Sequence, residues 1–328
     1  MKIIMSQRKE ELERALKAHR STVTVEAEYG NSVIEGIILT MAHHGPRADN
    51  PAPCLAWHQA GEVSYPGLRG KTDITSVEVV GVSHIDLDTL GGIAAILGRS
   101  SKTRKNDLTA SFWATAAEID VRGVHHLQSI LPGTVFSSIY EAPASCPLAY
   151  LLGIKEEVVD TLNAWYAWSA ENRLGRSDEA VVDVTDYVMS ALDIFDSLLF
   201  GKGVQLIKAG REWRAEQASL DAASYLETVG RVILRQTGGP FVNCFYRNSA
   251  AVVAFNERTR AVTLSLADPI HGVDVVAIAQ SLWGPEAGGR AGIAGSPRGK
   301  EMCIEDARKA AEKLNESILA THCAACMK

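Results

Sequence analysis

Apolar runs alternate with polar and glycine-rich segments along the first two thirds of the chain. Val79–Val82 is an uninterrupted apolar run typical of a buried strand, and Ile93–Leu97 is typical of the first turns of a packed helix. Strands are expected at 22–27, 36–42, 79–82 and 108–114. Helices are expected at about 7–19, 147–171 and 183–199, and a loop at 50–70. This alternation predicts a mainly parallel sheet with helices on both faces.

The last third of the chain has a different order of elements. Ser249–Phe255 and Ala261–Leu266 have the pattern of paired strands, Val273–Leu282 has helical spacing, and a glycine-rich loop is expected at 288–299. We therefore predict an α/β fold with a mainly parallel sheet flanked by helices and a second, smaller α/β domain. The expected parts are a first domain at 1–200, a helical connection at 201–227 and a second domain at 228–328.

Composition limits the classes of protein that remain. A chain of 328 residues is long enough for two domains of ordinary size. Its net charge of −6 gives no general attraction to nucleic acid, so duplex binding is not expected. We find no pattern of a signal peptide or membrane span, and expect a cytoplasmic protein with no membrane partner.

The cysteines are dispersed along the chain. The chain has six cysteines, and they are too widely spaced for a disulfide scaffold, so reduced thiols are expected. His322, Cys323 and Cys326 near the end offer three ligand atoms to a metal, but a solvent-facing tail is the favoured interpretation.

One segment joins a metal-binding pattern to a strand-to-helix turn. His84, Asp86 and Asp88 leave the expected end of the strand at 79–82. In an extended segment, residues two apart point to the same side, so one imidazole and two carboxylates can converge. Such a mixed nitrogen and oxygen set suits Mn²⁺, Zn²⁺ or Fe²⁺. The same residues also fit a polar turn in which Asp88 caps the next helix.

The segment His84–Gly91 resembles the H-x-D-x-D-x-x-G motif of the DHH phosphoesterase superfamily, which supplies ligands to a two-metal centre. The order of hairpin, helix and G-G-x-x-x-x-A-G loop at 249–299 resembles the DHHA1 domain that follows the catalytic domain in that superfamily. The resemblance implies a DHH-like catalytic domain and a DHHA1-like substrate-binding domain.

Two double-histidine segments compete for the position that gives this superfamily its name. His125 and His126 follow the first motif in the expected order, and Asp120 lies five residues before them instead of adjacent to them. We favour Asp120, His125 and His126 as completing the metal site. The alternative is that His43 and His44, which follow an apolar strand but have Ala42 in place of the aspartate, join from a rearranged N-terminal part.

A last acidic ligand is expected further along the chain. Asp183 is our candidate, with Asp186 as the other carboxylate of the same segment. Asp183 equally fits a cap for the helix that runs to Leu199.

The glycine-rich segment is the expected substrate-binding part. Glycines allow the backbone to approach a ligand closely, and arginines can pair with phosphate oxygens. The candidate residues are Gly288, Gly289, Arg290, Gly292, Gly295 and Arg298.

The resemblance implies a divalent-metal-dependent phosphoesterase. A metal-activated water would hydrolyse a phosphoester or phosphoanhydride bond of a nucleotide, short oligonucleotide or polyphosphate. We expect two Mn²⁺ ions, with Mg²⁺, Zn²⁺ or Co²⁺ as alternatives. His125 or His126 would protonate the leaving oxygen. The alternative is a catalytically degenerate protein that binds nucleotide or nucleic acid in a regulatory role, and a homodimer is compatible with either.

Overall fold

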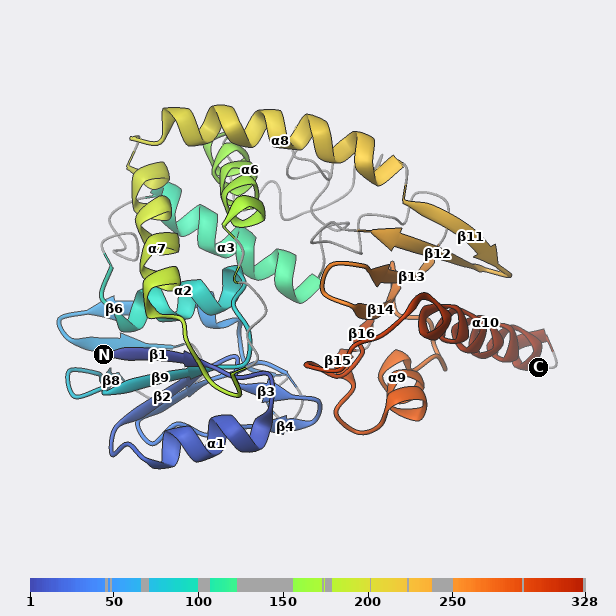
Figure 1. Ribbon diagram of the computed structural model, residues 1–328, viewed down its shortest axis with the longest axis horizontal. Helices are drawn as coiled ribbons and strands as arrows, with labels where there is room; N and C mark the ends of the chain where they lie inside the picture. The colour runs from blue at the N-terminus through green and yellow to red at the C-terminus, as the bar shows by residue number, and fades with distance from the viewer. Residues whose placement is uncertain are drawn as a thin grey trace. The chain divides into compact units, whose positions relative to one another are not determined.

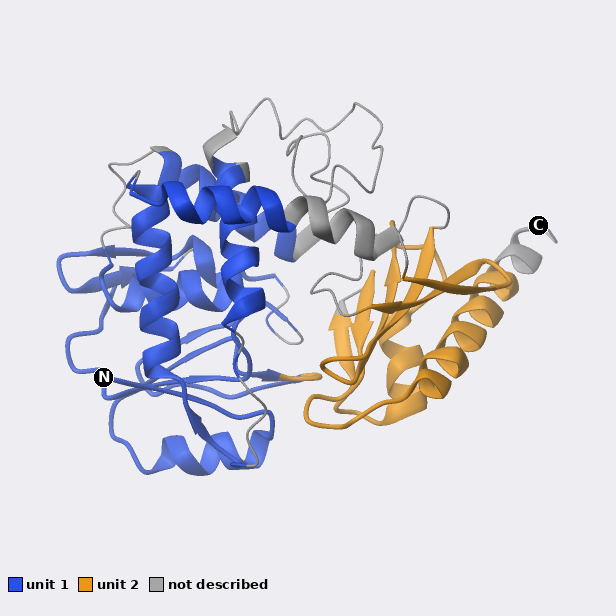
Figure 2. Cartoon of the chain, turned by 45° about the horizontal axis from the view of Figure 1, so that its top comes forward, with its two compact units in different colours: residues 1–28, 32–134, 144–215 blue, residues 29–31, 135–143, 216–328 orange. Residues whose placement is uncertain are grey.

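The chain folds as two compact units, coloured separately in Figure 2. The computed structural model describes residues 1–44, 47, 49–65, 71–99, 107–122, 156–172, 174, 179–200, 202–222, 224–237, 250–290 and 292–326. The first unit takes most of its residues from 1–215 and the second most of its residues from 216–328. The boundary falls within helix α8 (Val204–Ala222), which occupies much of the predicted helical connection.

A five-stranded sheet organises the first unit (Figure 1). Its strands lie in the order β10 (Val182–Asp183), β1 (Lys2–Met5), β9 (Val79–Val82), β2 (Thr22–Val25) and β5 (Leu39–Met41). Strands β1, β9, β2 and β5 are parallel to their neighbours, and β10 is antiparallel to β1. The predicted mainly parallel sheet is therefore confirmed.

Helices cover both faces of this sheet (Figure 1). On one face lies α1 (Lys9–Lys17), whose Leu16 packs over Gly81 of β9. On the other face lie α2 (Leu87–Ile96), α3 (Asp107–Arg122), α6 (Glu156–Glu171) and α7 (Thr185–Leu199). The rings of Phe112, Trp113 and Phe195 pack together at centroid distances of 4.9–5.3 Å, which joins α3 to α7 in the core.

Two expectations from the hydrophobic pattern are wrong in this unit. The strand expected at 108–114 is part of helix α3, because the buried residues Thr109, Phe112, Trp113 and Ala116 follow helical rather than alternating spacing. The expected loop at 50–70 contains a 3₁₀ helix, Pro53–Leu55, and two strands of a small antiparallel sheet. The strands of that sheet are β6 (Trp57–Gln59), β7 (Glu62–Ser64) and β8 (Thr72–Asp73).

The second unit is built on a mixed six-stranded sheet. Its strands lie in the order β11 (Tyr225–Val229), β12 (Val232–Thr237), β13 (Ala251–Asn256), β14 (Ala261–Leu266), β16 (Ile293–Gly295) and β15 (Gly288–Arg290). Helices α9 (Val275–Trp283) and α10 (Ile304–Cys326) bury apolar side chains of these strands against one face. The predicted strand pair and the helix after it are confirmed, so the smaller α/β domain is present.

The glycine-rich segment of this unit is a hairpin, not the expected loop. Strand β15 pairs with β16 in antiparallel register, with Gly289 opposite Ala294. A Cβ at Gly289 would lie 2.7 Å from the Cα of Ala294, so glycine is required there by close approach of the two strands. None of the helices in the described parts of the chain combines the length and apolar character needed to cross a membrane.

Candidate metal centre

The polar side chains of interest follow three neighbouring parallel strands. Glu26 comes after β2, His43 and His44 come shortly after β5, and His84 comes two residues after β9. Strand β9 pairs with β2, and β2 pairs with β5. Because carboxyl ends of parallel strands meet at one edge of a sheet, these segments lie side by side, where open α/β sheets bind their ligands.

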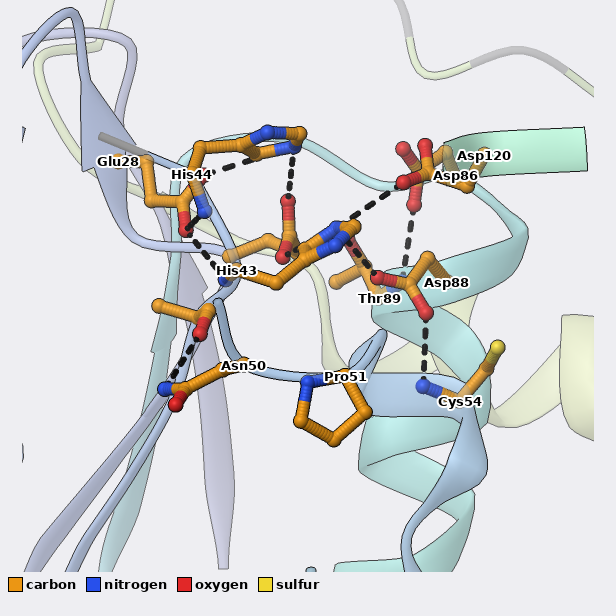
Figure 3. Close-up of polar contacts among 12 residues, drawn as sticks. Glu28, His43, His44, Asn50, Pro51, Cys54, Asp86, Asp88, Thr89 and Asp120 are labelled. Atoms are coloured by element: carbon orange, nitrogen blue, oxygen red, sulfur yellow. Dashed lines mark hydrogen bonds and ion pairs between the residues drawn. The ribbon is translucent and has the colours of Figure 1, made fainter. Parts of the chain in front are cut away.

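His43 lies at the centre of the first group of side chains. Its Nε2 atom is 2.9 Å from Asp120 Oδ2 and 3.2 Å from Asp88 Oδ2 (Figure 3). The same atom is 3.4 Å from Glu26 Oε1. His43, Asp88 and Glu26 are almost completely buried, and Asp120 is partly exposed at the end of the group. The ligand atoms of His43, Asp88 and Asp120 all lie within 4.8 Å of one another, a spacing that could hold a metal ion.

His44 forms a second group on the side of the cluster that faces Glu28. Its Nε2 atom is 3.4 Å from Glu26 Oε2 and 3.7 Å from Glu28 Oε2. Glu26, His43 and His44 also offer ligand atoms within 4.8 Å of one another. The two groups are therefore continuous, with Glu26 and His43 at the junction.

Several buried polar atoms in the cluster lack hydrogen bonds. Among the described residues, Glu26 Oε1, His43 Nε2 and Asp88 Oδ2 have no hydrogen-bond partner, although each is buried. Buried polar atoms are nearly always satisfied, and leaving one unsatisfied costs about 1–3 kcal/mol. These atoms lie at ion-pair distance from one another, and such a convergence of imidazole and carboxylate atoms could hold a metal ion.

The backbone around the double histidine is held by surrounding groups. Glu28 Oε1 accepts hydrogen bonds from the backbone N–H groups of His43 and His44, at 2.9 and 3.0 Å (Figure 3). Asn50 Nδ2 donates to the carbonyl oxygen of Ala42 at 3.1 Å. These bonds hold the backbone segment that carries both imidazoles.

Asp88 is fixed by helix α2 and by the neighbouring 3₁₀ helix. It is buried in the first turn of α2, and its Oδ1 atom accepts a hydrogen bond of 2.7 Å from the backbone N–H of Cys54. The other oxygen, Oδ2, faces His43. Asp88 thus has one oxygen committed to the fold and one directed into the cluster.

His84 and Asp86 do not share an extended segment with Asp88, because the chain has already turned into α2 at Leu87. Asp86, not Asp88, caps this helix, and its Oδ1 atom accepts from Thr89 N at 2.8 Å. Its Oδ2 atom is 2.9 Å from His84 Nε2. His84 and Asp86 form a partly exposed pair, and neither belongs to the two groups of convergent ligand atoms in the described residues.

Crowding of carboxylates shifts several pKa values. Burial, together with the charges of Glu28 and Asp88, raises the pKa of Glu26 well above its usual 4.5. Burial also raises the pKa of Asp88. Burial lowers the pKa of His43, but its close contacts with the carboxylates of Asp120 and Asp88 outweigh burial and raise that pKa from 6.5 to about 10. The metal-free cluster therefore retains protons that a cation would displace.

The pKa of Asp86 is shifted downward, unlike those of Glu26 and Asp88. Burial alone would raise the pKa of Asp86, but the His84 charge and hydrogen bond, with the Thr89 N–H, lower it below its usual range. Asp86 is therefore a carboxylate at neutral pH.

Helix α2 packs closely against the 3₁₀ helix beside the cluster, and a substitution can test how tightly the two are packed. Gly91 of α2 lies against the 3₁₀ helix, and an added Cβ would come within 2.7 Å of the Cα of Cys54. We expect Gly91→Ala to lower the free energy of unfolding by about 2–3 kcal/mol, because this clash outweighs the better helix propensity of alanine. Urea unfolding measures the change.

The matched control for this substitution is Gly295→Ala. The nearest atom to a Cβ there is the carbonyl oxygen of Val262, at 3.9 Å, so stability should change little. Equal stability of Gly91→Ala and wild type would show that α2 can move away from Cys54.

The other predicted site residues are placed as follows. His125 and His126 lie outside the described residues. Asp183 lies on β10, at the far side of β1 and β9 from β2, where it pairs with Lys2 at 3.3 Å and accepts a hydrogen bond from Thr185 N at 3.0 Å. It is outside both groups of convergent side chains, because these contacts commit it to the sheet edge and the start of α7.

The predicted substrate-binding residues are not all brought together. Gly288, Gly289 and Arg290 form β15 and pair with β16, which ends at Gly295. Gly292, in the turn, accepts a hydrogen bond from Leu266 N at 2.7 Å. Arg298 follows the opposite end of β16 and is exposed, so it does not share the hairpin turn with Gly292.

Glu26 and Glu28 were not predicted. The signal was available in Thr22–Glu28, where two acidic residues at alternate positions follow an apolar strand. This is the same pattern that identified Asp86 and Asp88. No family model, curated protein or solved structure matches the chain, so the case for this site rests on its own residues.

Proposed function

We propose that the chain is a divalent-metal-dependent phosphoesterase that hydrolyses a phosphoester or phosphoanhydride bond of a nucleotide, short oligonucleotide or polyphosphate. The observation that carries this proposal is the buried cluster at the carboxyl edge of the parallel sheet. Its members are two histidines and four carboxylates, Glu26, Glu28, His43, His44, Asp88 and Asp120.

The donor atoms of this cluster fit divalent cations. Carboxylate-rich sites that also contain imidazole suit Mn²⁺, and Mg²⁺, Zn²⁺ and Co²⁺ are the alternatives. The four carboxylates lie close to the two histidines and to one another. Their mutual repulsion and burial destabilise the ionised forms unless positive charge is present. Bound divalent cations would supply that charge and would satisfy the atoms that lack hydrogen bonds.

A bound pair of cations would provide Lewis acidity and lower the pKa of a water molecule that attacks phosphorus. The chain's own contribution is to place the ligands and to exclude water from most of them. His84 and Asp86 lie at the partly exposed end of the α2 turn. The ionised Asp86 holds the imidazole of His84 in place through its Nε2 atom, beside the cluster.

The resemblance to the DHH phosphoesterases supports the choice of phosphate chemistry. A double histidine and an H-x-D-x-D segment lie close together in this unit, because His43 contacts Asp88. Their order along the chain is the reverse of the order that the resemblance implies. We therefore propose that His43 and His44 are the double histidine of the site, although they precede the H-x-D-x-D segment in the sequence.

The test is a hydrolysis assay on metal-stripped protein with and without Mn²⁺. We expect release of nucleotide or phosphate from at least one of a dinucleotide, a nucleoside bisphosphate and polyphosphate. A chelator should abolish this release, and Mn²⁺ should restore it. If the protein binds Mn²⁺ and nucleotide but cleaves nothing, the degenerate, nucleotide-binding alternative is favoured. If it binds no Mn²⁺, the metal centre is wrong.

A further inference from the structure

Glu26 occupies a special position between the two histidines. Its two carboxylate oxygens face different imidazoles, with Oε1 at 3.4 Å from His43 Nε2 and Oε2 at 3.4 Å from His44 Nε2. The side chain is buried, and Oε1 has no hydrogen-bond partner among the described residues. A single carboxylate therefore reaches both halves of the cluster.

His43 cannot serve both halves in this way. Its Nε2 atom belongs to both groups of convergent ligand atoms, but an imidazole nitrogen has one lone pair and binds one cation. The distances from His43 to Asp120 and Asp88, 2.9 and 3.2 Å, are shorter than its distance to Glu26. His43 is therefore assigned to a cation shared with these two aspartates.

His44 is then left for a second cation. The acidic side chains within 4 Å of its Nε2 atom in the described residues are Glu26 and Glu28. Since Glu28 Oε1 accepts the two backbone N–H groups of the double-histidine turn, its Oε2 atom is the one directed to His44. Among the described residues of the cluster, Glu26 alone has one oxygen facing His43 and the other facing His44.

The backbone at Glu26 has an unusual conformation that serves this placement. Its φ angle is +50°, in the left-handed region that residues other than glycine seldom adopt. The conformation is held by hydrogen bonds from Glu26 N to Met41 O at 2.9 Å and from Ser83 Oγ to Glu26 O. Strained backbone of this kind tends to occur at functional sites.

We propose that Glu26 is the bridging ligand of a two-cation centre. One divalent cation is held by His43, Asp88 and Asp120, and the other by His44 and Glu28. Each cation also takes one oxygen of Glu26. This inference rests on the proposed function, since it divides the same cluster into two positions, and it predicts a spacing of about 3.5–4 Å between the cations.

The experiment compares Mn²⁺ binding to the metal-stripped full chain in wild type and Glu26→Gln. Calorimetry should give about two ions for wild type and about one for Glu26→Gln, because the amide has a single oxygen. Electron paramagnetic resonance should show magnetically coupled Mn²⁺ ions in wild type and an isolated ion in the variant. Glu10→Gln, an exposed carboxylate of α1, is the control and should behave as wild type.

The outcomes separate the bridge from the proposed function. Two coupled ions in both wild type and Glu26→Gln would overturn the bridge and leave the metal-dependent enzyme in place. No binding to folded wild type would overturn both. If Glu26→Gln does not fold, Glu26→Ala decides: it removes both carboxylate oxygens and should abolish the coupling, and a coupled pair as in wild type would contradict the bridge.

Discussion

Asp88→Asn is expected to lower turnover by at least about a hundredfold, since it removes a charged ligand from the centre of the proposed metal site. The substitution keeps an oxygen that can accept the hydrogen bond from Cys54 N, so the start of α2 should remain in place. It removes the negative charge that faces His43 at 3.2 Å. Initial rates at saturating Mn²⁺, together with calorimetric Mn²⁺ titration, measure both consequences.

The control for this substitution is Asp193→Asn. Asp193 is an exposed carboxylate of α7 that pairs with Arg99, so its loss changes the charge of the chain equally without reaching the cluster. Its turnover should stay close to that of wild type. Full activity and unchanged Mn²⁺ affinity in folded Asp88→Asn would place the reaction elsewhere.

Metal-free protein is expected to lose stability as pH rises from about 6 to 10, and Mn²⁺ is expected to restore it. The pKa of His43 is about 10 in the folded chain against 6.5 when unperturbed. A group with a raised folded pKa stabilises the fold below its unfolded value and loses that contribution as pH rises through the folded value. For His43 alone this loss is on the order of 4 kcal/mol.

The raised pKa values of Glu26 and Asp88 act with the same sign, because deprotonation adds negative charge to a buried acidic cluster. Melting temperatures with and without Mn²⁺, measured across this pH range, provide the test. The stabilisation by Mn²⁺ should grow with pH, since protons compete with the cation for the same atoms. A metal-free melting temperature that is flat or rising between pH 6 and 10 would contradict the shift at His43.

The sequence predicted the fold where local and tertiary signals agree. Val79–Val82 is apolar throughout because this strand lies inside the sheet, and Ala261–Leu266 pairs with the preceding strand across a short turn. The signal failed at 108–114, where Phe112 and Trp113 suggested a strand although they pack as part of a helix. Aromatic side chains fit either element, and only the burial of Thr109 and Ala116 distinguishes them.

The candidate site was predicted in part for a similar reason. Alternating acidic residues after a strand identified the region of Asp86 and Asp88, but strand pairing decides which other segments reach it. Strand β2 lies between β9 and β5, and this brings Glu26 and His43 to Asp88. Sequence spacing contains no information about that adjacency. The contact of His43 with Asp88 depends on that adjacency, whereas His125 and His126 lie outside the described residues.

The strand order β1, β9, β2, β5 has a consequence for how such centres can be encoded. The double histidine and the H-x-D-x-D segment each follow the end of a strand, and parallel neighbours present their ends at the same edge whichever strand is synthesised first. A gene could exchange the segments that carry the double histidine and the H-x-D-x-D pattern while the side chains kept their positions in space. Motif searches that require a fixed linear order would then miss an arrangement that is evident from the sheet.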